Sequence, residues 1–184
     1  IKKYFNQKNK LHLKNRAYLK QVKFFTEFLL AEDLQKQGDI TTNTLIKQNK
    51  KVEAKIIAKE SGVLAGMEEA KWFLKNYKLK ITNYKKDGAK IKKGDVLLTL
   101  HGGIKNILKV ERTVLNLLQR MSGIATQTEK LIRKTKNQAL ICATRKTQWG
   151  LLDKKAVTLG GGGTHRLGLH DFVMIKDNHL SATQ

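Results

Sequence analysis

The chain has 184 residues, 40% of them hydrophobic, and its 37 Lys and Arg against 15 Asp and Glu give a formal net charge of +22. This charge excludes an acidic or neutral surface. It favours an anionic partner (a nucleic acid, an anionic membrane, or a phosphorylated or carboxylated small molecule), unless it reflects only a lysine-rich solvated surface. One cysteine excludes an intramolecular disulfide framework and a multi-cysteine zinc site. No apolar run approaches the roughly 20 residues that cross a bilayer, and no apolar signal segment stands at the start, so we expect a cytoplasmic protein.

The chain is predicted to begin with an arm and a helix. Residues 1–23 are basic and weakly patterned, which indicates a frayed arm or a surface helix. Apolar residues at helical spacing in residues 24–34 predict a helix that ends before Gly38. Residues 38–42 (GDITT) are typical of a turn in which Asp and Thr side chains bond the local backbone.

Residues 24–106 are predicted to form an N-terminal domain of mixed strands and helices. Strands are expected at 52–58 and 96–100, with a helix at 67–76. This mixture of strands and helices is typical of an α+β arrangement. The stretch 87–98 is also similar to lipoyl and biotinyl carriers, but it lacks the lysine at a hairpin tip that those carriers modify.

The strongest helical pattern lies at 107–125, where apolar residues recur every three to four positions. Arg112 lies on a different stripe of this helix. The alternative to a functional role is that Arg112 is simply an exposed cation on the helix surface. We expect a break at Ser122–Gly123 before a second helical segment continues toward Lys136.

From about residue 139 the pattern changes to short βα units. Residues 139–143 and 172–175 are apolar runs typical of buried strands, and residues 151–159 fit a helix. We therefore expect residues 107–184 to form the start of an α/β barrel. A closed barrel needs about 200 residues or more, so we expect its C-terminal part to be absent and the chain to be a fragment.

Cationic side chains follow both predicted strands. Thr144, Arg145 and Lys146 come directly after the first strand, and Lys176 comes after the second. Anions bind at the carboxyl ends of parallel strands, where Arg grips a carboxylate or phosphate with two hydrogen bonds and Lys adds a point charge. The alternative is a solvated basic turn.

Four glycines at 160–163 precede Thr164, His165 and Arg166. Such a run can present backbone N–H groups to an anion, although it is not a Walker motif, and the alternative is a flexible connector. Together, the strand-end cations and the His-Arg pair indicate a pocket for a small, highly negative ligand.

Other chemistry fits less well. The histidines and aspartates between positions 165 and 179 match no standard zinc spacing. Cys142 lies within an apolar run and is typical of a core residue, with a nucleophile beside His165 as the alternative. Nucleic-acid binding rests on net charge alone, without a helix-turn-helix, zinc-finger or RNP pattern.

Six motifs occur in order within residues 28–180: AEDLQKQGDITT (31–42), SGVLAG (61–66), ERTVLNLLQRMSGIAT (111–126), TRKTQWG (144–150), GGGGTHRLGL (160–169) and DFVMIKDNH (171–179). In combination they resemble the quinolinate phosphoribosyltransferase family, also called carboxylating nicotinate-nucleotide pyrophosphorylases. The resemblance implies that quinolinate and phosphoribosyl pyrophosphate, with Mg²⁺, give nicotinate mononucleotide, pyrophosphate and carbon dioxide for NAD biosynthesis. It also implies an α/β sandwich, an incomplete α/β barrel, and a homodimer in which the neighbour's N-terminal domain closes each site.

The resemblance further implies a substrate site of seven residues: Arg112, Thr144, Arg145, Lys146, His165, Arg166 and Lys176. Arg145 and the His-Arg pair would hold the quinolinate carboxylates, and Arg112 would reach the pocket from the other subunit. The two lysines would lie between quinolinate and phosphoribosyl pyrophosphate, and Thr144 would belong to the binding stretch. No residue would act as a nucleophile, so catalysis would consist mostly of positioning and electrostatics.

The chain departs from the family pattern at four positions. Ala143 stands where Asp is usual, Trp149 where Pro is usual, Lys155 where Tyr is common, and Thr164 where Asn is frequent. Loss of the proline is expected to loosen the turn after residues 144–147. The acidic residues for ribose and Mg²⁺, and the loops for the 5′-phosphate, would lie beyond the last residue.

The alternative function is that of a relative of the same fold linked to molybdate transport, with an unsettled substrate. A more distant alternative is a basic nucleic-acid-binding protein.

Overall fold

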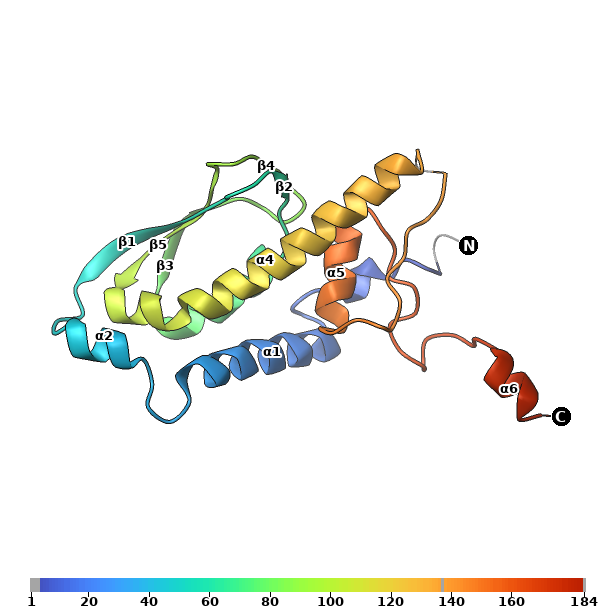
Figure 1. Cartoon of the computed structure of the whole chain (residues 1–184), viewed down its shortest axis with the longest axis horizontal. Helices are drawn as coiled ribbons and strands as arrows, with labels where there is room; N and C mark the ends of the chain where they lie inside the picture. The colour runs from blue at the N-terminus through green and yellow to red at the C-terminus, as the bar shows by residue number, and fades with distance from the viewer. Residues whose placement is uncertain (1–3, 137, 184) are drawn as a thin grey trace.

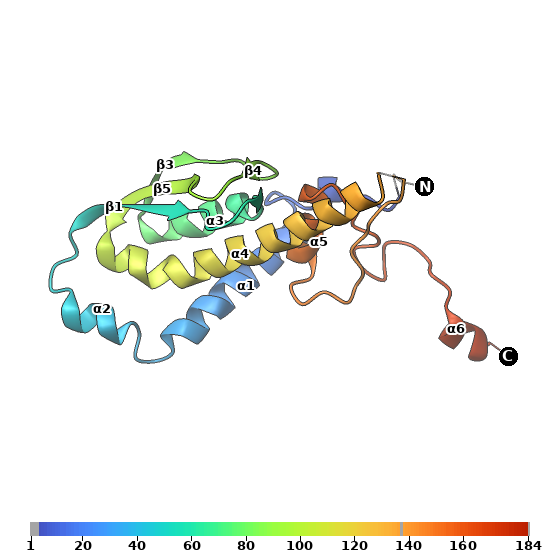
Figure 2. The same cartoon turned by 45° about the horizontal axis from the view of Figure 1, so that its top comes forward.

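The computed structural model of the chain describes residues 4–136 and 138–183. Its N-terminal part is layered: a small sheet lies above the helices α3 (Met67–Leu74) and α4 (Ile104–Lys134), and α1 (Arg16–Leu34) lies below α4 (Figure 1 and Figure 2). The hydrophobic core fills the space between these layers. Beyond the sheet, α4 continues and packs against α5 (Leu151–Leu159).

The main sheet is antiparallel and has the order β1-β5-β3. Its strands are β1 (Lys51–Ile57), β5 (Val96–Gly103) and β3 (Lys80–Tyr84). A separate antiparallel pair is formed by β2 (Gly62–Val63) and β4 (Lys90–Ile91). The element β5 is central and mostly buried, whereas β1 alternates between exposed and half-buried residues, as expected for a strand with one face on the core.

The strands predicted at 52–58 and 96–100 are confirmed as β1 and β5. The helix predicted at 67–76 is confirmed as α3, extended by the 3-10 turn η2 (Lys75–Tyr77). The sequence does not predict β3, because only Ile81 of its five residues turns toward the core.

The helix α1 begins at Arg16 and not at residue 24, after a short 3-10 turn η1 (Lys8–Lys10). The side-chain oxygen of Asn15 caps it by accepting the N–H groups of the second and third residues that follow. Tyr18 and Val22 are fully buried, so the predicted arm in fact contributes to the core, and the predicted domain division at residue 24 falls inside α1. The arm was predicted because these few apolar residues are diluted by lysines.

Two further predictions about helices are wrong. The expected turn at 38–42 contains the start of a helix, α2 (Ile40–Leu45). The predicted bond of Asp39 to the local backbone is confirmed, because its carboxylate accepts the amide of Thr42 and caps this helix. The expected break at Ser122–Gly123 is absent. The Ser122 hydroxyl bonds the backbone of Ala65, and α4 runs through this point without interruption.

The helix predicted at 151–159 is confirmed as α5, but residues 139–143 and 172–175 do not form strands. The first segment makes one isolated parallel bridge, between Cys142 and Gly163. In the second, Val173 and Ile175 are 87% and 68% exposed. A buried strand needs hydrogen-bonded neighbours, and among the described residues no strand lies beside either segment. The described chain ends with the short helix α6 (Asp177–Ser181). The mixed α/β class is confirmed, and of the predicted barrel the described chain forms one parallel bridge, between Cys142 before α5 and Gly163 after it.

Candidate substrate site

A parallel bridge brings the two cationic loops of the C-terminal part together. The amide of Ala143 donates to the carbonyl of Gly163 at 3.1 Å, and the amide of Gly163 donates to the carbonyl of Ile141 at 2.8 Å. Residues 144–146 therefore leave this crossing next to residues 164–166.

The glycine run at 160–163 forms hydrogen bonds within the fold and allows the close approach of chain segments at this crossing. The amides of residues 160–163 all donate to main-chain carbonyls, which belong to Ala156, Thr158, Val157 and Ile141. The prediction that these amides face an anion is therefore wrong. A Cβ on Gly163 would lie 2.7 Å from the carbonyl oxygen of Phe5 and 2.8 Å from Cys142 Sγ, so glycine is needed here because chain segments cross closely.

His165 is held in a defined orientation. Its backbone lies in the left-handed region (φ 51°), and its amide donates to the carbonyl of Phe5 at 2.9 Å. Its ring packs against the rings of Phe5 and Phe172, with centroids 5.1 and 5.4 Å away, and these two rings also contact each other. Its Nδ1 accepts the amide of Arg166 at 2.7 Å, which leaves Nε2 to carry the proton of the neutral ring.

The surroundings of His165 favour the neutral imidazole. Burial lowers its pKa from the ordinary value of 6.5, and the positive charges of Lys154, Arg166 and Lys176 lower it further. His165 is thus arranged to donate one hydrogen bond through Nε2 without needing a charge.

Arg166 is the buried cation of the site. It is 6% exposed, its Nη1 donates to the carbonyl of Phe172 at 3.3 Å, and its guanidinium lies 5.9 Å from the centre of the Phe172 ring. Phe172 therefore packs against both members of the His-Arg pair, although it lies in a segment predicted to be a strand.

The remaining cations of the predicted site are exposed. Arg145 and Lys146 lie in the loop after the crossing, where Thr144 Oγ1 accepts the amide of Lys146 at 3.1 Å. Lys176 precedes α6, and its amide donates to Nδ1 of His179 at 3.0 Å. Burial lowers the pKa of Lys154, and the charge of Arg145 adds a smaller effect; burial likewise lowers the pKa of His165, and the charge of Lys176 adds to it.

Arg112 is not part of this group. It is exposed on α4, in a hollow of about 240 Å³ that is also lined by Asp39 and Ile40. Figure 1 shows that α5 and its adjoining loops lie against the opposite end of α4. Within one chain, the crossing at Cys142 and Gly163 joins the starts of the loops 144–146 and 164–166, and Arg112 lies on another element.

The sequence interpretation missed Lys154. This residue of α5 is 2% exposed, and its Nζ donates to the carbonyl of Thr164 at 2.6 Å, directly before His165. A signal was present, because Asp153, Lys154 and Lys155 are three consecutive charged residues inside an apolar helix. Such a triplet is typical of buried polar contacts on several sides of a helix.

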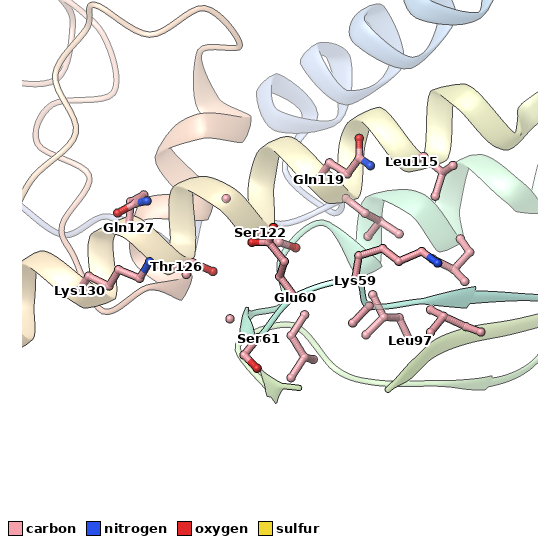
Figure 3. Close-up of a pocket in the computed structure, with 17 residues that line it drawn as sticks. Lys59, Glu60, Ser61, Leu97, Leu115, Gln119, Ser122, Thr126, Gln127 and Lys130 are labelled. Carbon is pink, nitrogen blue, oxygen red and sulfur yellow. The ribbon is translucent and has the colours of Figure 1, made fainter. Parts of the chain in front are cut away.

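A separate cavity of about 390 Å³ lies between α4 and the loop that follows β1 (Figure 3). Its lining includes Ser122 and Thr126 of α4, whose hydroxyls bond the backbone of residues 63–65. None of the seven predicted site residues lines it. Its polar groups join α4 to the sheet layer.

Within 4–136 and 138–183, no three His, Cys, Asp or Glu side chains are grouped so as to hold a metal ion. In the same part of the chain no helix has the length and apolarity to span a membrane.

Two family models match consecutive parts of the chain. The N-terminal domain of quinolinate phosphoribosyl transferase matches residues 39–122, and the C-terminal domain matches residues 124–184. The chain belongs to the quinolinate phosphoribosyltransferase family. This member spans about half the length of the curated relatives it matches.

Relatives and solved structures of this family cover most of the chain. The probable nicotinate-nucleotide pyrophosphorylase (carboxylating) of Methanothermobacter thermautotrophicus is 45% identical over 148 residues, which are 78% of this chain and 53% of the relative. That of Bacillus subtilis is 42% identical over 170 residues, 90% of this chain and 58% of the relative. The structure of the nicotinate-nucleotide pyrophosphorylase from Francisella tularensis matches with a TM-score of 0.81 and 33% identity, over 89% of this chain and 59% of that one.

One departure from the pattern of the quinolinate phosphoribosyltransferases is compensated by packing. Trp149, where proline was expected, stacks on Phe25 with ring centroids 5.4 Å apart and lies 4.9 Å from the guanidinium of Arg120. These contacts hold the Trp149 side chain against α1 and α4.

Proposed function

We propose that the protein transfers the phosphoribosyl group of phosphoribosyl pyrophosphate to quinolinate, with decarboxylation, in NAD biosynthesis. The products are nicotinate mononucleotide, pyrophosphate and carbon dioxide. The observation that carries the proposal is the parallel crossing, which joins the cationic loop 144–146 to the His-Arg pair 165–166. The family membership supports the same substrates.

In this proposal the cations hold the two carboxylates of quinolinate. Arg145 and Arg166 bind carboxylate oxygens, and the neutral His165 donates through Nε2. The pyridine nitrogen then forms a bond to C1 of the ribose as the bond from C1 to pyrophosphate breaks. Loss of carbon dioxide leaves an electron pair on the ring carbon beside the cationic nitrogen, and this carbon takes a proton. Both steps need charge stabilisation and positioning and no protein nucleophile.

Phosphoribosyl pyrophosphate would be placed by Lys146 and Lys176, with Thr144 in the binding stretch. Both lysine side chains are exposed and free of carboxylate partners within the described residues. In this proposal Mg²⁺ binds to the pyrophosphate group of phosphoribosyl pyrophosphate, because the described residues supply no acidic cluster to hold it.

We further infer a homodimer in the cytoplasm, in which Arg112 completes the site of the other subunit. Arg112 lies in the N-terminal half of α4, about two turns before the α5-contacting Arg120, and lines a hollow with Asp39 and Ile40; this position supports the inference. The single cysteine suits a reducing compartment.

The test is quinolinate-dependent release of carbon dioxide in the presence of phosphoribosyl pyrophosphate and Mg²⁺. Arg166→Ala is expected to raise the quinolinate KM by at least ~30-fold, since removing one partner of a buried charge pair costs about 2–5 kcal/mol. Lys134→Ala, an exposed cation in the last turn of α4, is the matched control and should change nothing. Absence of carbon dioxide release from the wild type, or equal KM values for both variants, would contradict the assignment.

A further inference from the structure

The helix α5 carries three consecutive charged residues, all buried: Asp153, Lys154 and Lys155 are 4%, 2% and 6% exposed. Successive residues of a helix with 3.6 residues per turn point in directions roughly 100° apart. Asp153 accordingly reaches Arg120 of α4, and Lys155 reaches Glu69 of α3. Lys154 points in the third direction, toward the candidate substrate site.

Lys154 holds the residue before His165. Its Nζ donates to the carbonyl of Thr164 at 2.6 Å. Thr164 is fully buried, and its Oγ1 donates to the carbonyl of His165 at 2.7 Å and accepts the amide of Gln7 at 2.9 Å. The left-handed backbone of His165 is strained for a residue other than glycine and persists only if its neighbours fix it. The ammonium of Lys154 is one of the groups that fix it.

The charge of Lys154 is not neutralised by an ion pair in the described part of the chain. Its described hydrogen-bond acceptor is a neutral carbonyl. The nearby Asp171 carboxylate is already engaged by the amide of Leu167 at 2.9 Å, by Lys10 and by Gln7. Burial lowers the pKa of Lys154, and the charge of Arg145 adds to this, against the opposing influence of Cys142 and Asp171. A buried cation without a carboxylate partner favours an anion bound nearby.

We propose that Lys154 is a positioning residue of the substrate site, which fixes the Thr164–His165 turn through the Thr164 carbonyl and supplies positive charge behind His165. This inference rests on the proposed function, because the anion it favours is quinolinate. It assigns a role within the site to a residue outside the loops that carry the predicted ligands.

The experiment compares Lys154→Met with the double variant Glu69→Gln/Lys155→Met. The control removes the neighbouring buried lysine together with its carboxylate partner, on the side of α5 that faces away from the site. Two readouts are taken on the full chain: the pKa of His165 by NMR titration of its ring, and quinolinate affinity by calorimetry. Lys154→Met should raise the His165 pKa and weaken quinolinate binding ~10-fold, whereas the control should change neither.

The charges of Arg166 and Lys176, which also lie near His165, are the same in both variants. A difference in the His165 pKa between the two variants therefore reports on Lys154. An unmoved His165 pKa together with unchanged quinolinate affinity in Lys154→Met would overturn the proposal. If that variant does not fold, NMR titration of the Lys154 side chain in the wild type decides: bound quinolinate should raise its pKa, and no change refutes the role. A folded wild type that binds no quinolinate would instead contradict the proposed function, while the His165 titration still tests the effect of Lys154.

Discussion

Arg120 and Asp153 form a two-point ion pair, in which Nε and Nη2 of Arg120 each donate to a different carboxylate oxygen at 2.8 Å. The same carboxylate accepts the amide of Trp149 at 3.1 Å, and Nη1 of Arg120 donates to Gln148 at 2.9 Å. One carboxylate thus joins α4, α5 and the turn that follows the cationic loop at 144–147. The position of that loop depends on this contact.

Asp153→Asn is expected to lower the free energy of unfolding by about 2 kcal/mol, because hydrogen bonds to charged groups contribute roughly 1.5–3 kcal/mol when one partner is buried. Urea denaturation measures the loss. The matched control is Glu27→Gln, whose pair with Lys23 is 3.8 Å long with both side chains 62% exposed. It should change stability by less than about 0.5 kcal/mol. Equal losses in the two variants would mean that the Arg120 contact does not stabilise the fold.

Lys155 joins α5 to the N-terminal layers through a buried carboxylate. Its Nζ lies 2.6 Å from Glu69 Oε1, which also accepts the hydroxyl of Tyr18 at 2.7 Å. Burial alone would lower the pKa of Lys155, but the charges and hydrogen bonds of Glu69 and Glu68 outweigh burial and raise it. Glu69 Oε2 has no hydrogen-bond partner among the described residues, so this carboxylate depends on the contacts of Oε1.

Lys155→Met should therefore cost about 3–5 kcal/mol, because it leaves a buried carboxylate without its cation. Adding Glu69→Gln should restore most of that loss, since both charges are then removed. The free energies come from urea denaturation of the two variants and the wild type. If the double variant is as unstable as Lys155→Met alone, unpaired charge is not the cause.

The sequence predicts α5 but not the three directions in which its charged residues point. Periodicity identifies which residues of a helix are buried, whereas the partners Arg120, Glu69 and Thr164 lie on three separate segments whose relative positions only the folded chain defines. Arg145 and Arg166 stand out in the sequence because they follow an apolar run and a glycine run, and their roles as substrate ligands stay predictions. The glycine run was misinterpreted because composition does not reveal where the amides point, and here they point at carbonyls.

Apolar composition alone also misled the prediction of strands. Residues 139–143 and 172–175 have the sequence of buried strands, but burial of a strand is a property of the sheet around it. Without neighbouring strands in the described chain, Val173 and Ile175 remain exposed. The segment nevertheless contributes Phe172, which packs against His165 and Arg166.

Two glycines provide a matched test of close packing. A Cβ on Gly163 would meet Phe5 and Cys142 at 2.7 and 2.8 Å, whereas a Cβ on Gly123 of α4 would meet nothing within 4 Å. Gly163→Ala should destabilise the chain by about 1–3 kcal/mol. Gly123→Ala should stabilise it by about 0.5–1 kcal/mol, because alanine is the better helix former. Thermal unfolding of both variants checks the opposite signs, and a stable Gly163→Ala variant would contradict the crowded crossing.

Asp87 is expected to make the free energy of unfolding depend on pH. Its carboxylate accepts the amides of Met67 at 2.8 Å and Glu68 at 3.2 Å at the start of α3. Burial raises its pKa above 3.8, and the charge of Glu69 raises it further, despite the opposing effect of the two amides. The folded chain therefore binds this proton more tightly than the unfolded chain. The contribution of Asp87 to the free energy of unfolding consequently falls as pH rises through the interval that begins near 3.8.

Asp87→Asn removes this titration and keeps an oxygen acceptor. The stability of the wild type relative to the variant should decrease as pH rises from about 4 to about 7, as measured by urea denaturation at several pH values. A relative stability that increases over this interval would mean that the amides and the helix terminus favour the charged form more than burial disfavours it.

Arg112 gives the final prediction, which follows from the proposed dimer. Because Arg112 is exposed on α4, Arg112→Ala should leave the free energy of unfolding within about 0.5 kcal/mol of the wild type while abolishing turnover. At quinolinate concentrations well below KM, Arg166→Ala should also remove nearly all turnover, because its KM is raised. In a mixed dimer of the two variants, one site has both mutations and the other has neither. Equal amounts of the two inactive variants, unfolded and refolded together, should therefore regain about a quarter of wild-type activity. No regained activity, with mixed dimers shown to form by native mass spectrometry, would place Arg112 in the site of its own subunit or outside the site altogether.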